Sequence, residues 1–117
     1  MIDQKRNELA RVISLETGKN YNESVAEVNE ALHMAQFAFG SGRYSHGEAV
    51  SSEIADKDSY MLRKPKGVIG IITPFNFPGM IPFWFLPYAV ACGNSFILKP
   101  SEKLGLTAHK IFALLEE

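Results

Sequence analysis

One segment, residues 67–102, constrains the fold more than any other part of this chain of 117 residues. It begins Gly-Val-Ile-Gly-Ile-Ile-Thr-Pro-Phe-Asn-Phe-Pro and ends Phe-Ile-Leu-Lys-Pro-Ser-Glu. Two short apolar runs, 68–72 and 96–98, lack polar alternation, which predicts strands that are covered on both faces. The apolar run 80–92 between them predicts a helix. This order of elements makes a right-handed βαβ crossover with two parallel strands.

Polar and aromatic side chains follow both predicted strands at the point where each strand ends. Ligands of open parallel sheets bind beyond the carboxyl ends of the strands. We therefore expect a side-chain amide, an ammonium, a hydroxyl and a carboxylate to gather at one edge of this sheet. The residues concerned are Thr73, Phe75 and Asn76 after the first strand, and Lys99, Ser101 and Glu102 after the second.

Asn76 is the candidate for chemistry in the first turn. Pro74 and Pro78 stiffen its loop, and the flanking Phe75 and Phe77 can exclude water from it. A rigid, uncharged amide in a dry site suits an oxyanion that forms at a carbonyl carbon. The alternative is that Asn76 only supports the turn through its own backbone, as asparagine often does.

Glu102 is the candidate for nucleotide recognition in the second turn. A carboxylate at this edge can accept hydrogen bonds from both hydroxyls of a ribose, and it repels a 2′-phosphate, which favours NAD over NADP. The alternative is a surface ion pair between Lys99 and Glu102, worth about 0–1 kcal/mol. The segment does not contain the dinucleotide fingerprint Gly-x-Gly-x-x-Gly.

The first part of the chain predicts two helices that pack as an antiparallel pair across a short turn. Residues 3–16 follow the helical period, and Gly18 is well placed to end that helix. Asn20 is the expected cap of the second helix, and Gly40 and Gly42 are expected to stop it. The apolar stripe of the second helix, which we expect to pack in the core, consists of Val25, Val28, Leu32, Ala35 and Phe39.

The rest of the chain predicts a β-hairpin and a last helix. Residues 47–65 fit two short strands around a turn at 56–58. The last helix begins near Leu106 with Thr107 as a candidate cap, and its expected apolar face consists of Ile111, Leu114 and Leu115. A hairpin alone and a two-stranded parallel sheet with two exposed edges are both marginal in water. We therefore expect the chain to be a piece of something larger.

Composition and charge argue against several classes of protein. A net charge of −1 without a basic cluster does not favour a nucleic-acid partner. The longest apolar run, 80–92, is too short to span a bilayer. Cys92 is the only cysteine, which favours a reducing, cytoplasmic location, and we expect it to be a buried structural residue. No metal site is predicted, because the histidines lack the spacing of metal ligands: His33, His46 and His109.

The motifs of the chain resemble those of the aldehyde dehydrogenase superfamily. Thr-Pro-Phe-Asn-Phe-Pro is followed by an aromatic-rich helix and by Cys-Gly-Asn-Ser-Phe-Ile-Leu-Lys-Pro-Ser-Glu, and Leu-Glu-Thr-Gly-Lys at 15–19 and Glu27-Val28 also fit. The resemblance covers nearly the whole chain. The segment 76–84 is similar to the methylmalonate-semialdehyde dehydrogenase branch, which makes an acyl-CoA from a semialdehyde with NAD as oxidant. Other semialdehyde or glyceraldehyde dehydrogenases stay open.

The resemblance implies a role for each matched position. Asn76 matches the asparagine that stabilises the oxyanion. The other matched positions hold the cofactor: Thr73, Pro74 and Phe75 in the loop along the dinucleotide, and Lys99, Ser101, Glu102 and Lys103 at the adenosine ribose. In the implied reaction a cysteine thiolate attacks the aldehyde, hydride passes to nicotinamide, and water or coenzyme A releases the thioester.

The resemblance also implies what this chain lacks. The nucleophilic cysteine and the general-base glutamate of the family lie downstream of Lys-Pro-Ser-Glu, and Cys92 does not match the nucleophile's motif. We therefore expect an α/β fragment with a helical pair (1–46), an oligomerisation-type hairpin (47–66) and a βαβα portion of a Rossmann-like NAD-binding domain (67–117).

Two functions stay open on this basis. The first is a portion of an NAD-dependent dehydrogenase that acts on an aldehyde or semialdehyde as a homo-oligomer, and this portion is expected to be inactive in isolation. The second is a truncated, non-catalytic module that associates with itself or with full-length subunits.

Overall fold

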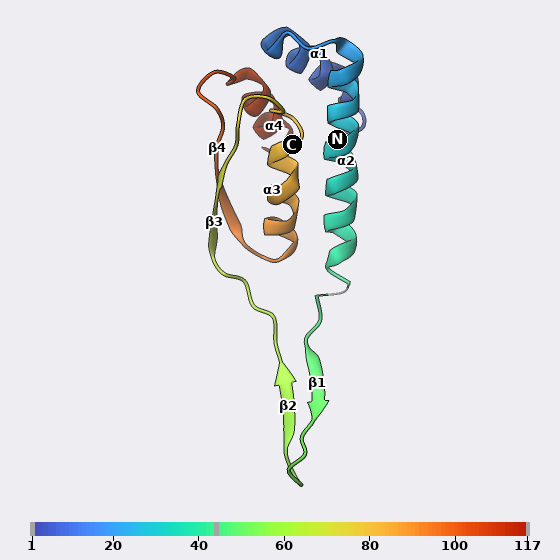
Figure 1. Ribbon diagram of the computed structural model, residues 1–117, viewed down its shortest axis with the longest axis vertical. Helices are drawn as coiled ribbons and strands as arrows, with labels where there is room; N and C mark the ends of the chain where they lie inside the picture. The colour runs from blue at the N-terminus through green and yellow to red at the C-terminus, as the bar shows by residue number, and fades with distance from the viewer. Residues whose placement is uncertain (1, 44, 117) are drawn as a thin grey trace.

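The protein is a mixed α/β structure, as predicted (Figure 1). The computed structural model describes residues 2–43 and 45–116. The elements in chain order are α1 (Arg6–Thr17), α2 (Tyr21–Ser41), β1 (Glu48–Ser51), β2 (Asp58–Met61), β3 (Val68–Ile72), α3 (Ile81–Ala91), β4 (Ser95–Lys99) and α4 (Leu106–Glu116). None of the helices in those ranges has the length and apolar character that crossing a bilayer demands.

Strands β3 and β4 form the predicted parallel pair, with Val68 opposite Ser95 and Ile72 opposite Lys99. The expectation that both faces are covered is wrong for this chain. Ile71 is buried, whereas Ile72 is 81% exposed and Ile97 is 67% exposed. Successive strand residues point to opposite faces, and helix α3 covers only one of these faces (Figure 1). Three apolar strand residues therefore lie exposed on an open face, namely Val68, Ile72 and Ile97.

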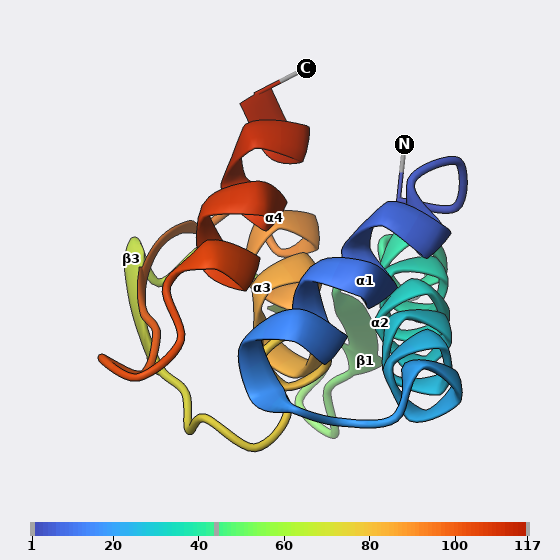
Figure 2. The same ribbon diagram turned by 90° about the horizontal axis from the view of Figure 1, so that it is seen from above.

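Helix α3 lies between this sheet and helix α2 (Figure 1). The core joins residues from both ends of the chain, namely Leu9, Ala10, Ile13, Val28, Ala31, Phe83, Ile111 and Leu114. Helix α1 lies across the end of α2, so the expected antiparallel pairing of these helices is wrong (Figures 1 and 2). Gly18 takes a left-handed conformation with φ 75° and the Asn20 side chain caps α2, which redirects the chain and lets α1 contact both α2 and α4.

The buried face of α2 differs from the predicted stripe. Phe39 is 87% exposed, so its assignment to the core is wrong. The residues of α2 that are buried are Ser24, Glu27, Val28, Ala31 and Ala38. Small side chains on this face permit close packing against α3. Gly40 lies inside the helix, which ends at Ser41 with Gly42 as its C-cap. Leu115 of α4 is also exposed, contrary to prediction.

Strands β1 and β2 form the predicted antiparallel hairpin, which projects away from the core (Figure 1). Asp56, with φ 64°, lies in the connection, and Asp58 begins β2. All residues of both strands are exposed. The molecule measures 65 × 25 × 24 Å and has a radius of gyration of 18.3 Å, against about 13 Å for a compact chain of this length. The hairpin therefore adds length to the molecule without adding to its core.

The side chain of Asn94 fixes the point where the chain returns from the hairpin to the sheet. Its Oδ1 atom accepts hydrogen bonds from the backbone N–H groups of Lys66 and Gly67, at 2.5 and 2.9 Å. Gly67 has φ 110°, a conformation that favours glycine. The start of β3 is thereby tied to the loop that precedes β4.

We expect the substitution Gly79→Ala to destabilise the protein by about 1–3 kcal/mol, as overpacking of a core does. An alanine Cβ at this position would lie 2.6 Å from Cδ1 of Ile13 and 3.3 Å from Oε1 of Glu27. The matched control is Gly105→Ala, because a Cβ at Gly105 meets no heavy atom within 4 Å. Urea unfolding of both variants measures the effect, and equal stability of the two would contradict it.

Candidate functional site

The turns that follow β3 and β4 lie side by side at the carboxyl edge of the sheet, as predicted. The backbone N–H of Thr73 donates to the carbonyl oxygen of Lys99 at 3.1 Å. The ammonium of Lys103 lies 4.7 Å from the centroid of the Phe75 ring, within the range of a cation–π interaction. These two contacts couple the loop that carries Asn76 to the loop that carries Glu102.

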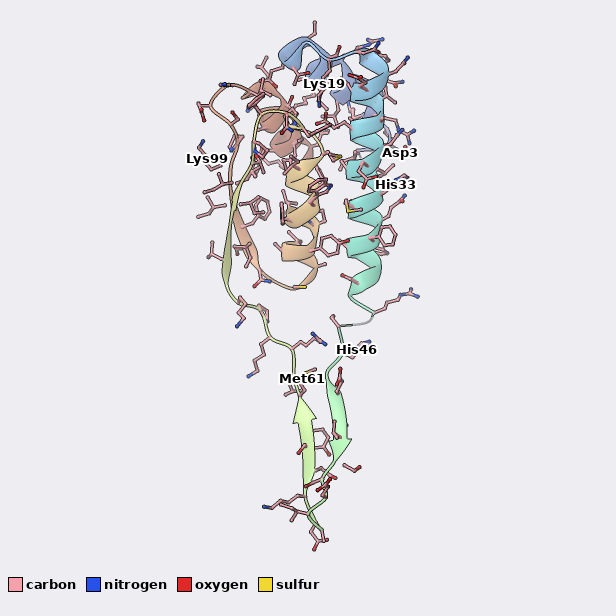
Figure 3. All side chains as sticks on the ribbon, viewed as in Figure 1. Asp3, Lys19, His33, His46, Met61 and Lys99 are labelled. Atoms are coloured by element: carbon pink, nitrogen blue, oxygen red, sulfur yellow. The ribbon has the colours of Figure 1, made fainter. Side chains whose placement is uncertain are left out.

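In the second turn, the hydroxyl of Ser101 serves the backbone and the charged side chains face solvent. Ser101 is buried and its Oγ accepts a hydrogen bond from the N–H of Lys103 at 3.3 Å. Lys99 Nζ lies 3.1 Å from Glu102 Oε2, and both side chains are exposed (Figure 3). Ser101 therefore shapes the turn, while the ammonium and the carboxylate are the groups that a ligand can reach.

The pKa of Glu102 is lowered from its ordinary value. The largest cause is a hydrogen bond from its own backbone N–H, followed by the hydrogen bond and the charge of Lys99. A carboxyl whose pKa is lower in the folded chain stabilises the fold above the ordinary glutamate pKa, and this contribution is lost as the pH falls. Glu102 is therefore an anion at neutral pH, and both of its oxygens can accept hydrogen bonds from hydroxyl groups.

In the first turn, Thr73 is buried at the strand end and Asn76 is exposed. Within the described ranges, no hydrogen bond holds the Asn76 side chain, so its amide is open to a ligand. The loop is held instead by the residues that follow it. The N–H groups of Gly79 and Met80 donate to Oε1 of Glu27, at 2.7 and 3.2 Å. These N–H groups precede α3, so the carboxylate also stabilises the positive end of that helix.

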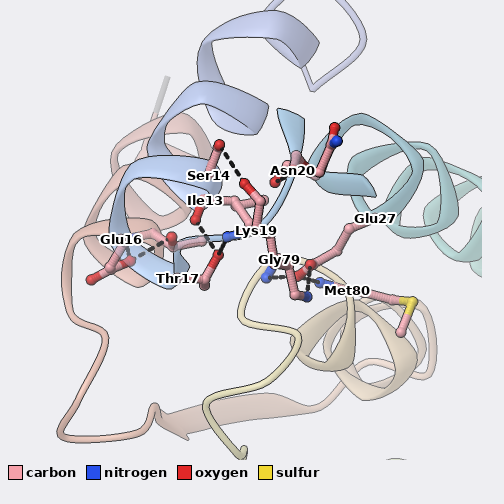
Figure 4. Close-up of polar contacts among 11 residues, drawn as sticks. Ile13, Ser14, Glu16, Thr17, Lys19, Asn20, Glu27, Gly79 and Met80 are labelled. Atoms are coloured by element: carbon pink, nitrogen blue, oxygen red, sulfur yellow. Dashed lines mark hydrogen bonds and ion pairs between the residues drawn. The ribbon is translucent and has the colours of Figure 1, made fainter. Parts of the chain in front are cut away.

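Glu27 is the centre of a buried polar cluster (Figure 4). Its side chain is 0% exposed, and its second oxygen, Oε2, lies 2.7 Å from Nζ of Lys19. The same ammonium lies 3.7 Å from the centroid of the Phe77 ring. An ionised side chain is seldom fully buried unless it is paired. Glu27 meets that condition through one ammonium and two backbone donors.

The turn between α1 and α2 holds the backbone of Lys19 firmly (Figure 4). Ser14 Oγ donates to the carbonyl oxygen of Lys19 at 2.7 Å. The N–H of Lys19 donates to Oγ1 of Thr17 at 3.2 Å, and Thr17 Oγ1 donates to the carbonyl oxygen of Ile13 at 2.6 Å. Lys19 therefore extends its side chain toward Glu27 from a well-defined backbone position.

Glu16 caps helix α4, and the expectation that Thr107 caps this helix is wrong. The N–H groups of Leu106 and Thr107 donate to the two carboxylate oxygens of Glu16 at 2.7 and 2.9 Å, and the Thr107 hydroxyl donates to Oε2 at 2.6 Å. Thr107 lies in the first turn of the helix, where its hydroxyl meets a partner 91 residues away in the sequence. Sequence spacing cannot reveal such a cap.

The prediction that Cys92 is buried is wrong, because its side chain is exposed at the end of α3. It borders a cleft of about 440 Å³ that is also lined by Arg63, Lys64 and Lys66. His33 is exposed on α2 and His46 is exposed before the hairpin (Figure 3). His109 is exposed on α4. Residues 2–43 and 45–116 contain no group of three His, Cys, Asp or Glu side chains able to hold a metal ion.

Residues 1–117 match the model of a protein family described as the aldehyde dehydrogenase family. The chain belongs to the aldehyde dehydrogenase family. The resemblance of its motifs to that family is therefore confirmed. Glu16, Lys19 and Glu27 lie in the two short stretches that carry the resemblance in the first part of the chain. The pairing of Lys19 with Glu27, and the bonds of Glu27 and Glu16 to residues before α3 and in α4, are not predictable from the sequence.

Three related proteins illustrate how much of a dehydrogenase this chain spans. Malonate-semialdehyde dehydrogenase 2 of Oceanobacillus iheyensis is 47% identical over 110 residues, which are 94% of this chain and 23% of that protein. Betaine aldehyde dehydrogenase of Staphylococcus aureus in complex with NAD+ superposes with a TM-score of 0.91 at 37% identity, covering 98% of this chain and 23% of that one. A Sinorhizobium meliloti structure complexed with NAD, assigned as a methylmalonate-semialdehyde dehydrogenase, gives a TM-score of 0.93 at 36% identity with the same coverage. This family member therefore spans 23% of the length of each.

We expect the substitution Lys99→Met to raise the pKa of Glu102 toward its ordinary value, because Lys99 supplies part of the shift. Titration of the side-chain carboxyl carbon by NMR measures this pKa. The matched control is Lys110→Met, which removes an ammonium that lowers the pKa of Glu8. The control should raise the pKa of Glu8 alone, and an unchanged pKa of Glu102 in Lys99→Met would contradict the expectation.

Proposed function

We propose that this chain is the part of an NAD-dependent semialdehyde dehydrogenase that carries the oxyanion donor and the adenosine end of the cofactor site. The observation that carries the proposal is the meeting of the two turns at one edge of the sheet, where Asn76, Lys99 and Glu102 are all exposed. Membership of the family and the NAD complexes of its structural relatives support the same reading.

The second turn fits the adenosine half of NAD. The Glu102 carboxylate is ionised and exposed, and it can accept hydrogen bonds from two ribose hydroxyls. Lys99 lies 3.1 Å from that carboxylate and adds a donor at the same edge. Ser101 and Lys103 would shape this turn and connect it to the ring of Phe75. Thr73, Pro74 and Phe75 would lie along the dinucleotide, whose nicotinamide supplies the hydride acceptor when it is bound.

Asn76 would act on the substrate. A thiolate that attacks an aldehyde converts the carbonyl oxygen into an oxyanion, and the thiolate in this reaction comes from a cysteine outside the residues of this chain. The uncharged amide of Asn76 donates a hydrogen bond to that oxyanion.

The substrate class and the acyl acceptor are inferred from the related proteins and from the sequence of the segment 76–84. We infer a malonate- or methylmalonate-type semialdehyde, because a malonate-semialdehyde dehydrogenase is 47% identical over 110 residues and the methylmalonate-type structure is 36% identical to this chain. Coenzyme A or water then releases the thioester. The cytoplasmic location stays a prediction from the single cysteine.

A second candidate function is association between chains through the hairpin. The division into 1–46, 47–66 and 67–117 assigns the hairpin to oligomerisation, and the exposure of Val50, Tyr60 and Leu62 favours this role. In this reading the chain is a non-catalytic module that associates with itself or with longer subunits. The two candidates differ in whether the chain binds NAD.

We expect the 117-residue chain to bind NAD saturably but to form no NADH from malonate semialdehyde, with or without coenzyme A, because it supplies no matched nucleophile. Isothermal titration calorimetry measures the binding, and absorbance at the NADH band measures turnover. A folded chain without NAD affinity would favour the associating module, and turnover would contradict the inactivity.

We expect the chain to bind NAD more tightly than NADP, and the substitution Glu102→Gln to weaken NAD binding about tenfold, since a hydrogen bond to a charged group contributes about 1.5–3 kcal/mol. The variant should also narrow the difference between NAD and NADP, because it removes the charge that repels a 2′-phosphate. Glu53→Gln, in the exposed connection of the hairpin, is the matched control and should bind NAD normally. Equal affinities for the two cofactors in the unaltered chain would count against this role of Glu102.

A further inference from the structure

The ion pair between Lys19 and Glu27 is directed at the loop that carries Asn76. Its two residues lie in the α1–α2 turn and in α2, remote in sequence from that loop (Figure 4). The carboxylate holds the N–H groups of Gly79 and Met80, and the ammonium covers the ring of Phe77 at 3.7 Å. The two side chains therefore contact three of the four residues that follow Asn76, namely Phe77, Gly79 and Met80.

Asn76 has an aromatic neighbour on each side, and each of these rings lies under an ammonium. Phe75 lies under Lys103, at 4.7 Å from its centroid, and Phe77 lies under Lys19. A cation–π contact at a partly exposed site stabilises one ring position by about 0.5–1 kcal/mol. Asn76 therefore lies between two rings that each have a preferred position, and Glu27 holds the backbone that follows.

The capping of helix α3 by Glu27 does not by itself require the ammonium of Lys19. A glutamate carboxylate, or the oxygen of a glutamine amide, is a sufficient acceptor for the N–H groups of Gly79 and Met80. A buried ion pair carries a desolvation cost that its own attraction offsets only in good geometry. The contact that Lys19 adds beyond capping is the one with Phe77, next to Asn76.

We propose that Lys19 and Glu27 are positioning residues that fix the direction of the Asn76 amide. This inference rests on the proposed function of Asn76 as the oxyanion donor and deepens it. Lys19 acts on the ring of Phe77 and Glu27 acts on the backbone of Gly79 and Met80, and neither needs to touch the substrate. A displacement of about 1 Å in a reacting group can reduce a rate about 100-fold.

The first test uses the 117-residue chain and NMR, so it does not depend on catalysis. In Lys19→Met we expect changed chemical shifts of the Asn76 side-chain amide and of the Phe77 ring protons, because the ammonium over that ring is lost. Exchange of the Met80 N–H should change less than threefold, because Glu27 still accepts its hydrogen bond. Lys19→Arg should restore the shift of Asn76. An unchanged Asn76 resonance in Lys19→Met would overturn the proposal.

The second test places the chain in a complete enzyme, by exchanging it for the matching 110 residues of the Oceanobacillus iheyensis dehydrogenase. In this chimera we expect Lys19→Met to lower kcat about 10- to 100-fold with the KM for NAD unchanged, and Lys19→Arg to recover most of that loss. Asn76→Ala gives the full effect of losing the donor, which we expect to be about 100- to 1,000-fold in kcat.

The matched control is Glu16→Gln, which alters the other carboxylate that caps a helix but has no contact with the Asn76 loop. It should leave kcat unchanged. An equal loss of kcat in Glu16→Gln and Lys19→Met would mean a general effect on folding and would overturn the positioning role. If Asn76→Ala left kcat unchanged, the proposed function itself would fail, while the NMR measurement would still decide whether Lys19 positions Asn76.

Discussion

The buried carboxylate of Glu27 joins parts of the chain that are far apart in sequence. It connects helix α2 to the start of α3 through two backbone hydrogen bonds and to the α1–α2 turn through Lys19. Three donors around one carboxylate satisfy a charge that would otherwise be costly to bury. The close approach also requires glycine at position 79, where a larger residue would contact Ile13 and Glu27. The packing of α1, α2 and α3 therefore depends on this one acceptor.

Glu16 repeats the arrangement at the neighbouring helix. Its two oxygens accept from the first N–H groups of α4, as Glu27 accepts from those before α3. The two helices that follow the strands of the parallel pair are thus both capped from the N-terminal helices. Only the Glu27 cap lies next to the Asn76 loop, so helix α2 contributes to the position of that loop, whereas the Glu16 cap stabilises α4.

The local parts of the structure could be predicted from the sequence, whereas the long-range contacts could not. The apolar runs of β3 and β4 and the turn glycine at 18 determine structure within a few residues, so the βαβ unit and the end of α1 were predictable. The burial of Glu27, the exposure of Phe39 and Cys92, and the cap of α4 depend on partners tens of residues away. A glutamate on the buried face of a helix is the one local signal that a distant partner was needed.

The hairpin of β1 and β2 projects from the core (Figure 1), and among the described residues its strands contact no other helix or strand. The chain re-enters the sheet at a point fixed by Asn94. Residues without shared neighbours contribute to stability independently. Changes of sequence in the hairpin can therefore leave the geometry around Asn76 and Glu102 unchanged. The proposed association surface and the candidate site can therefore diverge separately in evolution.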